Sequence, residues 1–144
     1  MSKKSSTAVD PLFGKDKKFR RRVEGRFRPL LGALSGAKFR AKVTELCARC
    51  NMELPYEEAV RMFKMMIVQR VYDYDVDTVV SEVADRRSLL YFVGIIDLAT
   101  LPTAEALRGF RMRLGGDGVN EFYDFFEALM QERRLLYKAL FIIC

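Results

Sequence analysis

The stretch PYEEAVRMFKMMIVQRVYDY, residues 55–74, decides the fold. Pro55 suits the first position of a helix, where its missing N–H is not needed, and two glutamates follow in the first turn, where they interact favourably with the helix dipole. Residues 60–71 are apolar on almost every side of that helix. A helix that is apolar all round is buried, so we expect this segment to be the central helix of the domain.

The neighbouring segments also carry helix signals. Residues 38–51 place their apolar side chains on one helical face. Asp75 is suited to cap a helix whose valines keep helical spacing, and a short helix from Ser88 should stop near Gly94. Thr103 should cap a helix over residues 104–114, which the run Gly-Gly-Asp-Gly at 115–118 ends.

The last segment predicts the longest helix, over residues 119–143, because its apolar side chains alternate three and four residues apart. Residues 135–144 read LLYKALFIIC and contain one charge, more apolar surface than a free terminus tolerates. We therefore expect this helix to mediate self-association or docking onto another protein. Its candidate interface residues are Phe122, Phe126, Leu129, Leu136, Leu140 and Ile143.

Length and composition narrow the class of protein. A chain of 144 residues with 50% hydrophobic side chains can form one compact domain with a core. It contains no histidine, which excludes serine–histidine catalysis and histidine-ligated zinc. No apolar run reaches the ~18–20 residues that span a bilayer, and the first residues lack the apolar region of a signal peptide. We expect a cytoplasmic protein without a membrane partner.

Positive charge is concentrated at the front of the chain. Residues 1–50 contain 14 Lys and Arg against four acids, a net charge of +10, and the remaining 11 bases and 15 acids give −4. Residues 1–28 show no apolar period, so we expect a flexible basic arm. Such an arm could neutralise DNA phosphates, merely solubilise the chain, or bind an anionic membrane or an acidic protein. The candidate DNA contacts in it are Lys15, Lys17, Lys18, Arg20, Arg21, Arg22, Arg26 and Arg28.

A second basic group lies on the helix predicted over residues 104–114. Arg108 and Arg111 are three residues apart and therefore neighbours on one face, with Arg113 farther round. The helix follows two shorter ones at helix-turn-helix spacing, so these arginines could enter a major groove or lie along phosphates. The alternative is a solvated polar face.

Two motifs are similar to metal-binding sites but lack some of the ligands that such sites need. Cys47 and Cys50 form a C-x-x-C, but Cys144 is the one remaining cysteine, and both lie on the apolar face of a predicted helix, where cysteine packs as a small hydrophobe. Three aspartates at 73, 75 and 77 imitate a calcium loop, but Thr78 replaces its glycine and Ala84 its glutamate. We expect no metal, no other cofactor and no catalytic residue.

Three blocks resemble a known family: PYEEAVRMFKMMIVQRVYDY at 55–74, SLLYFVGI at 88–95 and LPTAEALRGFRMRL at 101–114. Together they resemble the N-terminal domain that precedes the catalytic core in bacterial insertion-sequence transposases of the DDE class. The chain departs from the usual family pattern at Thr103 and Ala106, where an aspartate and a threonine are common. In that family a long helix then leads into a ribonuclease H-like core, and this sequence ends at Cys144, before the metal-binding acids of such a core.

The fold we expect is therefore all-α: a small helical bundle over residues 29–144 with a helix-turn-helix-like portion and a long C-terminal helix, preceded by a disordered basic arm over residues 1–28. The resemblance implies a non-catalytic DNA-binding and assembly domain of a truncated or repurposed transposase. It would bind double-stranded DNA, form homo-oligomers or join an intact transposase, and associate with the bacterial nucleoid. The alternative is a protein-interaction module that dimerises, or docks onto an intact transposase and inhibits it.

Overall fold

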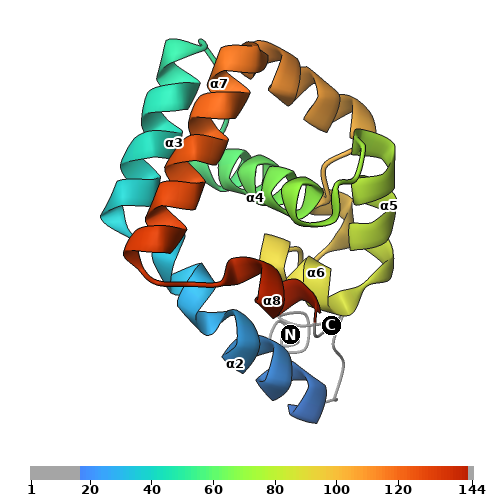
Figure 1. Ribbon diagram of the computed structural model, residues 1–144. Coiled ribbons are helices and arrows are strands. Elements are labelled where there is room, and N and C mark those ends of the chain that lie inside the picture. Colours follow the sequence, from blue (N-terminus) through green and yellow to red (C-terminus); the bar gives the residue numbers. More distant parts are fainter. Residues whose placement is uncertain (1–16, 143–144) are drawn as a thin grey trace, which may run out of the picture.

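The structure is a computed structural model that describes residues 17–142. Within that range every regular element is helical, which confirms the all-α fold (Figure 1). The elements are α2 (Lys17–Ala33), α3 (Ala37–Arg49), α4 (Tyr56–Tyr72), α5 (Val76–Asp85), α6 (Arg87–Val93), the 3-10 helix η1 (Leu98–Thr100), α7 (Ala104–Glu132) and α8 (Tyr137–Ile142).

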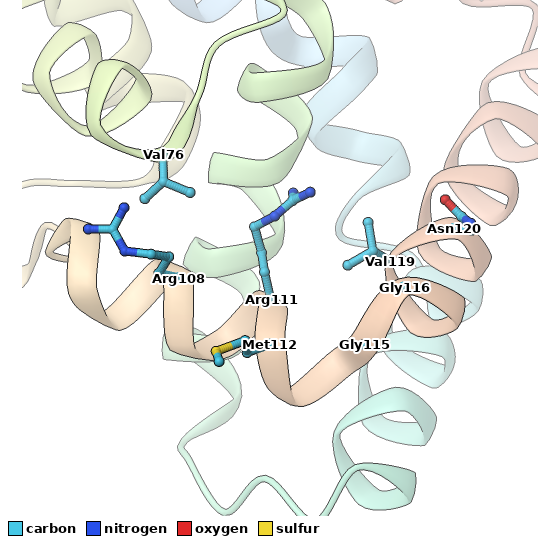
Figure 2. Close-up of a pocket in the computed structure, with 8 residues that line it drawn as sticks. All are labelled: Val76, Arg108, Arg111, Met112, Gly115, Gly116, Val119 and Asn120. Carbon is cyan, nitrogen blue, oxygen red and sulfur yellow. The ribbon is translucent and has the colours of Figure 1, made fainter.

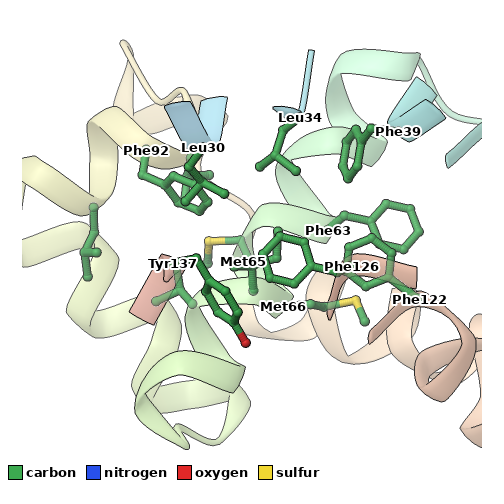
Figure 3. Packing of buried hydrophobic residues seen from close by; sticks show 14 of the residues in the cluster. Leu30, Leu34, Phe39, Phe63, Met65, Met66, Phe92, Phe122, Phe126 and Tyr137 are labelled. Atoms are coloured by element: carbon green, nitrogen blue, oxygen red, sulfur yellow. The ribbon is translucent and has the colours of Figure 1, made fainter. Parts of the chain in front are cut away.

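Helix α4 lies in the middle of the bundle, as its all-round apolar sequence predicts (Figure 1). Its residues Met65, Met66, Ile67 and Val68 are consecutive, so they point in all directions round the helix, and all four are fully buried. Phe63 on the same helix faces other aromatic side chains of the core (Figure 3). The remaining helices each cover part of α4 or of its immediate neighbours.

The helix boundaries follow the capping residues that the sequence offers. The Asp75 carboxylate accepts a hydrogen bond from the Thr78 amide at 2.7 Å and begins α5. The Thr103 hydroxyl accepts one from the Ala106 amide at 3.0 Å and begins α7. Gly94 ends α6 with a φ of 90°, a value that glycine adopts without a steric penalty.

Helix α7 is two helical segments joined at a bend. Gly115 has φ 73° and ψ 170°, values outside the helical region, so the first segment ends where the glycine run was expected to end it. The second segment starts again at once and turns to run beside α3 (Figure 1). The two segments thus approach α4 from different directions.

The second segment of α7 is shorter than the helix expected over residues 119–143. It ends at Glu132, and Arg134 takes a φ of 56° in the turn that follows. The chain then folds back as α8, whose Tyr137 and Phe141 are buried. Apolar spacing alone did not indicate this break, because the residues of α8 continue the three-and-four pattern after the turn.

The expected flexible arm is wrong for residues 17–28, because these residues form the first part of α2. Val23, Phe27 and Leu30 follow the helical spacing i, i+4, i+7, and all three are fully buried. Arginines, Gly25 and Pro29 surround them in sequence and hide this pattern. The domain boundary expected between residues 28 and 29 therefore falls inside a helix. Residues 1–16 of the expected arm lie outside the described residues.

Phe27 attaches α2 to the rest of the bundle. Its ring centroid lies 5.4 Å from that of Phe92 on α6 and 5.1 Å from that of Phe141 on α8. The Phe92 and Phe141 rings are themselves 5.0 Å apart, edge to face, a favourable arrangement for aromatic pairs. Three aromatic rings from three helices thus form one cluster beneath the basic helix.

This cluster predicts that Phe27→Ala destabilises the protein. Truncating a buried phenylalanine removes apolar burial and leaves a cavity, at a cost of about 3–5 kcal/mol. Chemical denaturation followed by circular dichroism measures the loss. Arg22→Ala is the control on the same helix, because Arg22 is exposed and surface changes usually stay within about 0.5 kcal/mol. Equal stabilities for the two variants would mean that α2 does not pack on the bundle.

Candidate nucleic-acid interface

The exposed side of α2 carries most of the candidate DNA contacts. Because Val23, Phe27 and Leu30 turn one face of the helix to the core, the cations between them point to solvent. Within residues 17–142, these exposed cations form no ion pair with an acidic side chain. They are Lys17, Lys18, Arg21, Arg22 and Arg28. We call these five residues the basic face of α2.

The other two basic residues of α2 are placed differently. Arg20 forms an ion pair with Glu24, with Nε and Oε2 3.3 Å apart, one turn along the helix. Arg26 is half-buried. Lys15, the remaining candidate of the expected arm, lies outside the described residues. Glu24 is the single acid of α2, so it reduces the positive charge at one edge of the helix and leaves the basic face intact.

Two residues without large polar side chains shape the basic face. Pro29 lies inside α2 and has no N–H to donate to the Gly25 carbonyl, which is the acceptor one turn earlier. Both residues are exposed, so water can hydrogen-bond that carbonyl. A Cβ added at Gly25 would meet no atom within 4 Å. The carbonyl that Pro29 leaves without an intrahelical donor is therefore on the exposed side of α2.

The basic residues of α3, by contrast, are largely neutralised by the second segment of α7. Lys38 lies 2.6 Å from Glu132, and Lys42 and Arg49 lie 3.1 Å and 2.7 Å from Glu121. Hydrogen bonds from Arg49 and Lys42 lower the pKa of the Glu121 carboxyl, which keeps it ionised. Among residues 17–50, the positive charge without acidic partners thus lies mainly on α2.

The three arginines of the first segment of α7 do not form one cluster. Arg108 is exposed and reaches Asp77 of α5, with its guanidinium nitrogen 3.4 Å from the carboxylate. Arg111 is half-buried and donates to the Gln69 side-chain oxygen at 3.0 Å and to the Tyr123 hydroxyl at 3.2 Å. The sequence shows that these residues share a helix, but it does not show which neighbours each one meets.

Arg113 stabilises the end of a different helix. Its guanidinium donates to the Asn51 carbonyl at 2.5 Å and to the Cys50 carbonyl at 3.4 Å, just after α3 ends. The last carbonyls of a helix lack intrahelical donors and attract cations. The three arginines therefore connect α7 to α5, to α4 and to the end of α3.

A surface cavity of about 560 Å³ lies beside these arginines, at the bend of α7 (Figure 2). Arg108 and Arg111 line it together with Val76 and with Val119 from the second segment. Met112 contributes to the rim and is 78% exposed. Both cations of the cavity already have partners inside the protein. Fewer of their hydrogen-bond donors are therefore available to a bound anion than the two arginines alone would indicate.

Arg111 is accordingly expected to matter for stability. Its removal leaves the buried Gln69 oxygen without this donor, and an unsatisfied buried polar group costs about 1–3 kcal/mol. We predict that Arg111→Met lowers the free energy of unfolding by this amount. Arg108→Met is the matched control, because an exposed ion pair contributes about 0–1 kcal/mol. The prediction fails if thermal denaturation gives the two variants the same midpoint.

The expected oligomer interface is wrong for Phe122, Phe126 and Leu129. These side chains are at most 4% exposed and belong to the core of the same chain. Figure 3 shows Phe122 and Phe126 among the other aromatic side chains of that core. This apolar face of the second segment of α7 points into the bundle because α3 and α4 cover it. Leu140 is half-buried, and Ile143 lies outside the described residues.

Leu136 remains accessible, with 83% of its surface exposed. Ile142, which was not among the expected interface residues, is 77% exposed and lies at the end of α8. Its exposure results from the turn after α7, which rotates α8 so that Tyr137 and Phe141 face the core. Of the expected interface residues that the structure describes, the one largely exposed side chain is therefore Leu136, in the turn before α8.

The cysteines and acidic residues show no metal-binding arrangement in the described part of the chain. Cys47 and Cys50 are half-buried against the core with free thiols, and burial raises the pKa of the Cys47 thiol. Residues 17–142 contain no group of three or more histidine, cysteine, aspartate or glutamate side chains that could hold a metal ion. Asp75, from the imitated calcium loop, is occupied in capping α5.

No single helix among residues 17–142 is long and apolar enough to cross a membrane. The helical stretches Arg87–Val93 and Leu98–Glu132 together reach the length and apolar composition of a membrane span, but they are bent by 59° relative to each other.

Comparison with known proteins gives no relative: no family model matches the chain, and neither the curated proteins nor the solved structures contain a significant match.

Proposed function

We propose that the chain binds double-stranded DNA through the basic face of α2. The observation that carries this proposal is the placement of five exposed cations, without acidic partners in the described chain, on a helix that is attached to a folded core. Phosphate contacts of lysine and arginine release counterions and supply most of the affinity of non-specific DNA binding. A docked helix presents its cations in a fixed arrangement, so fewer degrees of freedom are lost on binding than with a flexible arm.

The dimensions of the basic face suit a duplex. Residues 17–28 rise about 17 Å along the helix axis, at about 1.5 Å per residue. A duplex carries about one phosphate charge per 1.7 Å, so the same length presents about ten phosphates to five cations. No base-reading side chain is needed for this contact, and we expect binding without strong sequence preference.

The DNA-binding proposal predicts that replacing Lys17, Arg21 and Arg28 by glutamine weakens binding. If each cation contacts a phosphate, the slope of log K against log salt becomes shallower by about 0.9 per residue. The affinity then falls by nearly three orders of magnitude at about 0.1 M salt, because three lost contacts change log K by about 2.7. Fluorescence anisotropy with a labelled random duplex measures both quantities.

The control for this experiment removes the same amount of charge elsewhere. Arg49→Gln, Arg134→Gln and Lys138→Gln together also lower the net charge by three, but they lie on α3, on the turn after α7 and on α8. We expect this variant to retain most of the affinity and of the salt dependence. An equal loss of affinity in both variants would mean that the net charge of the chain, and not the basic face, determines duplex binding. An unchanged affinity in the α2 variant would exclude the basic face as the DNA contact.

We further propose, from the sequence resemblance, that the chain is a DNA-binding and assembly domain similar to the N-terminal domain of insertion-sequence transposases. The resembling blocks at 55–74, 88–95 and 101–114 lie on α4, α6 and the first segment of α7, and they contribute to one continuous core. The helix-turn-helix portion of this proposal corresponds to α5, α6 and that first segment. In this arrangement the side chain of Arg108 is 55% exposed and accessible for a DNA contact.

The exposed apolar side chains of α8 and its preceding turn favour a second candidate function, a protein-interaction module. Leu136 borders a surface cavity of about 300 Å³ between the end of α7 and α8, into which a partner's apolar side chain could insert. The partner proposed is a second copy of the chain or an intact transposase. Both functions can coexist, because the contacts use different residues.

Self-association predicts that Leu136→Lys with Ile142→Lys converts oligomers to monomers. Both side chains are largely exposed, so the substitutions should leave the fold intact while placing charges in the contact. Sedimentation velocity at micromolar concentration measures the species. Leu98→Lys is the control, an exposed leucine between α6 and α7. A wild-type protein that sediments as a monomer would exclude this candidate function.

A further inference from the structure

A second group of basic side chains lines a cavity that none of the preceding functions uses. The cavity has a volume of about 250 Å³ and lies between α3, α4 and the end of α6. Three cations from two helices border it: Arg40 of α3, and Arg61 and Lys64 of α4. Tyr56 and Glu57, at the start of α4, complete its polar lining.

The three cations are held together without an acidic partner. Within residues 17–142, none of them lies within ion-pair distance of a carboxylate, although Glu57 borders the same cavity. Arg40 stacks on the Tyr56 ring, with its guanidinium carbon 4.1 Å from the ring centroid, which fixes its position. Arg61 and Lys64 are three residues apart on one helix and therefore repel each other.

Lys64 lies against the aromatic core. Its ammonium nitrogen lies 5.8 Å from the centroid of the Phe92 ring, at the boundary of the aromatic core. Burial, with a further contribution from Arg61, lowers the pKa of Lys64 to about 8. The Lys64 side chain is half-buried, so its ammonium has lost part of its hydration without gaining a counter-charge, and a bound anion would offset this cost. At the bend of α7, by contrast, Arg108 and Arg111 already have protein partners.

We propose that the cavity formed by Arg40, Arg61 and Lys64 binds a phosphate group. Two arginines and one lysine line the same small cavity and supply several hydrogen-bond donors, and arginine matches the oxygens of a phosphate with paired hydrogen bonds. The volume is below the ~300–1,000 Å³ of sites for drug-sized molecules, so it suits a phosphate with a small attached group. The phosphate could belong to a small phosphorylated molecule or to a DNA backbone, and the site itself does not depend on the DNA-binding proposal.

Inorganic phosphate is the probe for the first experiment. The full chain, with isotope-labelled lysines, is titrated with phosphate at constant ionic strength at neutral pH, where Lys64 is protonated. We expect a saturable shift of the Lys64 signals and an upward shift of the Lys64 pKa, because the bound anion favours the charged amine over the neutral one. Titration with chloride is the reference. Equal shifts with chloride would overturn the proposal.

Two variants test whether the cavity residues make the contact. Arg40→Gln removes one charge-assisted hydrogen-bond donor, and we expect phosphate affinity to fall about tenfold. Lys64→Met removes the buried charge but keeps a similar shape, so the protein should fold and lose phosphate binding. Lys138→Met on α8 is the matched lysine control and should bind phosphate like the wild type. Undiminished phosphate affinity in Arg40→Gln and Lys64→Met would overturn the proposal.

A duplex-binding measurement with Lys64→Met distinguishes the two sources of phosphate. Weaker duplex binding with a salt slope that is shallower by about 0.9 assigns the cavity to a backbone phosphate. Unchanged duplex binding, together with lost binding of inorganic phosphate, assigns it to a small phosphorylated molecule. If the α2 variants show that the chain does not bind DNA, the titration with inorganic phosphate still tests this cavity by itself.

Discussion

The fold depends on the contact of one aromatic ring of α4 with both segments of α7. The centroid of Phe63 lies 5.0 Å from that of Phe110 and 4.3 Å from that of Phe122. These two residues are 12 positions apart, which in a straight helix is about 18 Å, too far for one ring to touch both. The bend at Gly115 is therefore required by the core. Arg111 and Tyr123 meet across the same angle, and the Tyr123 hydroxyl donates to the Met66 carbonyl of α4 at 2.7 Å.

The sequence predicted what is encoded locally. Asp75, Thr103 and the glycines at 94 and 115 act on backbone groups a few residues away, and all four mark the boundaries that were expected of them. It could not predict α2, since the helical spacing of Val23, Phe27 and Leu30 becomes evident only when Phe92 and Phe141 supply the surface that covers them. Phe122 and Phe126 failed as interface residues for the related reason that spacing defines an apolar face without naming its partner.

The candidate nucleic-acid interface was likewise predictable from the sequence only in part. That the front of the chain is basic follows from composition, but which cations are available follows from packing. Glu121 and Glu132, far away in the sequence, neutralise α3, whereas α2 contains a single acid of its own. Arg111 and Arg113 looked like recognition residues and are occupied in holding α7. Arg40, Arg61 and Lys64 could not be grouped from the sequence, because they border one cavity only when α3 packs on α4.

The aromatic cluster under α2 has a consequence for the order in which the molecule can be completed. Phe27 leaves the ribosome 114 residues before Phe141, on which it packs. At about 5–20 residues per second, synthesis of the intervening chain takes several seconds or more. Throughout that interval α2 lacks part of its hydrophobic cover, while its cations are already present. The helix that we propose to contact DNA is thus made before the other described helices and is completely covered only after α8 has been made, and during synthesis its apolar side is open to chaperones.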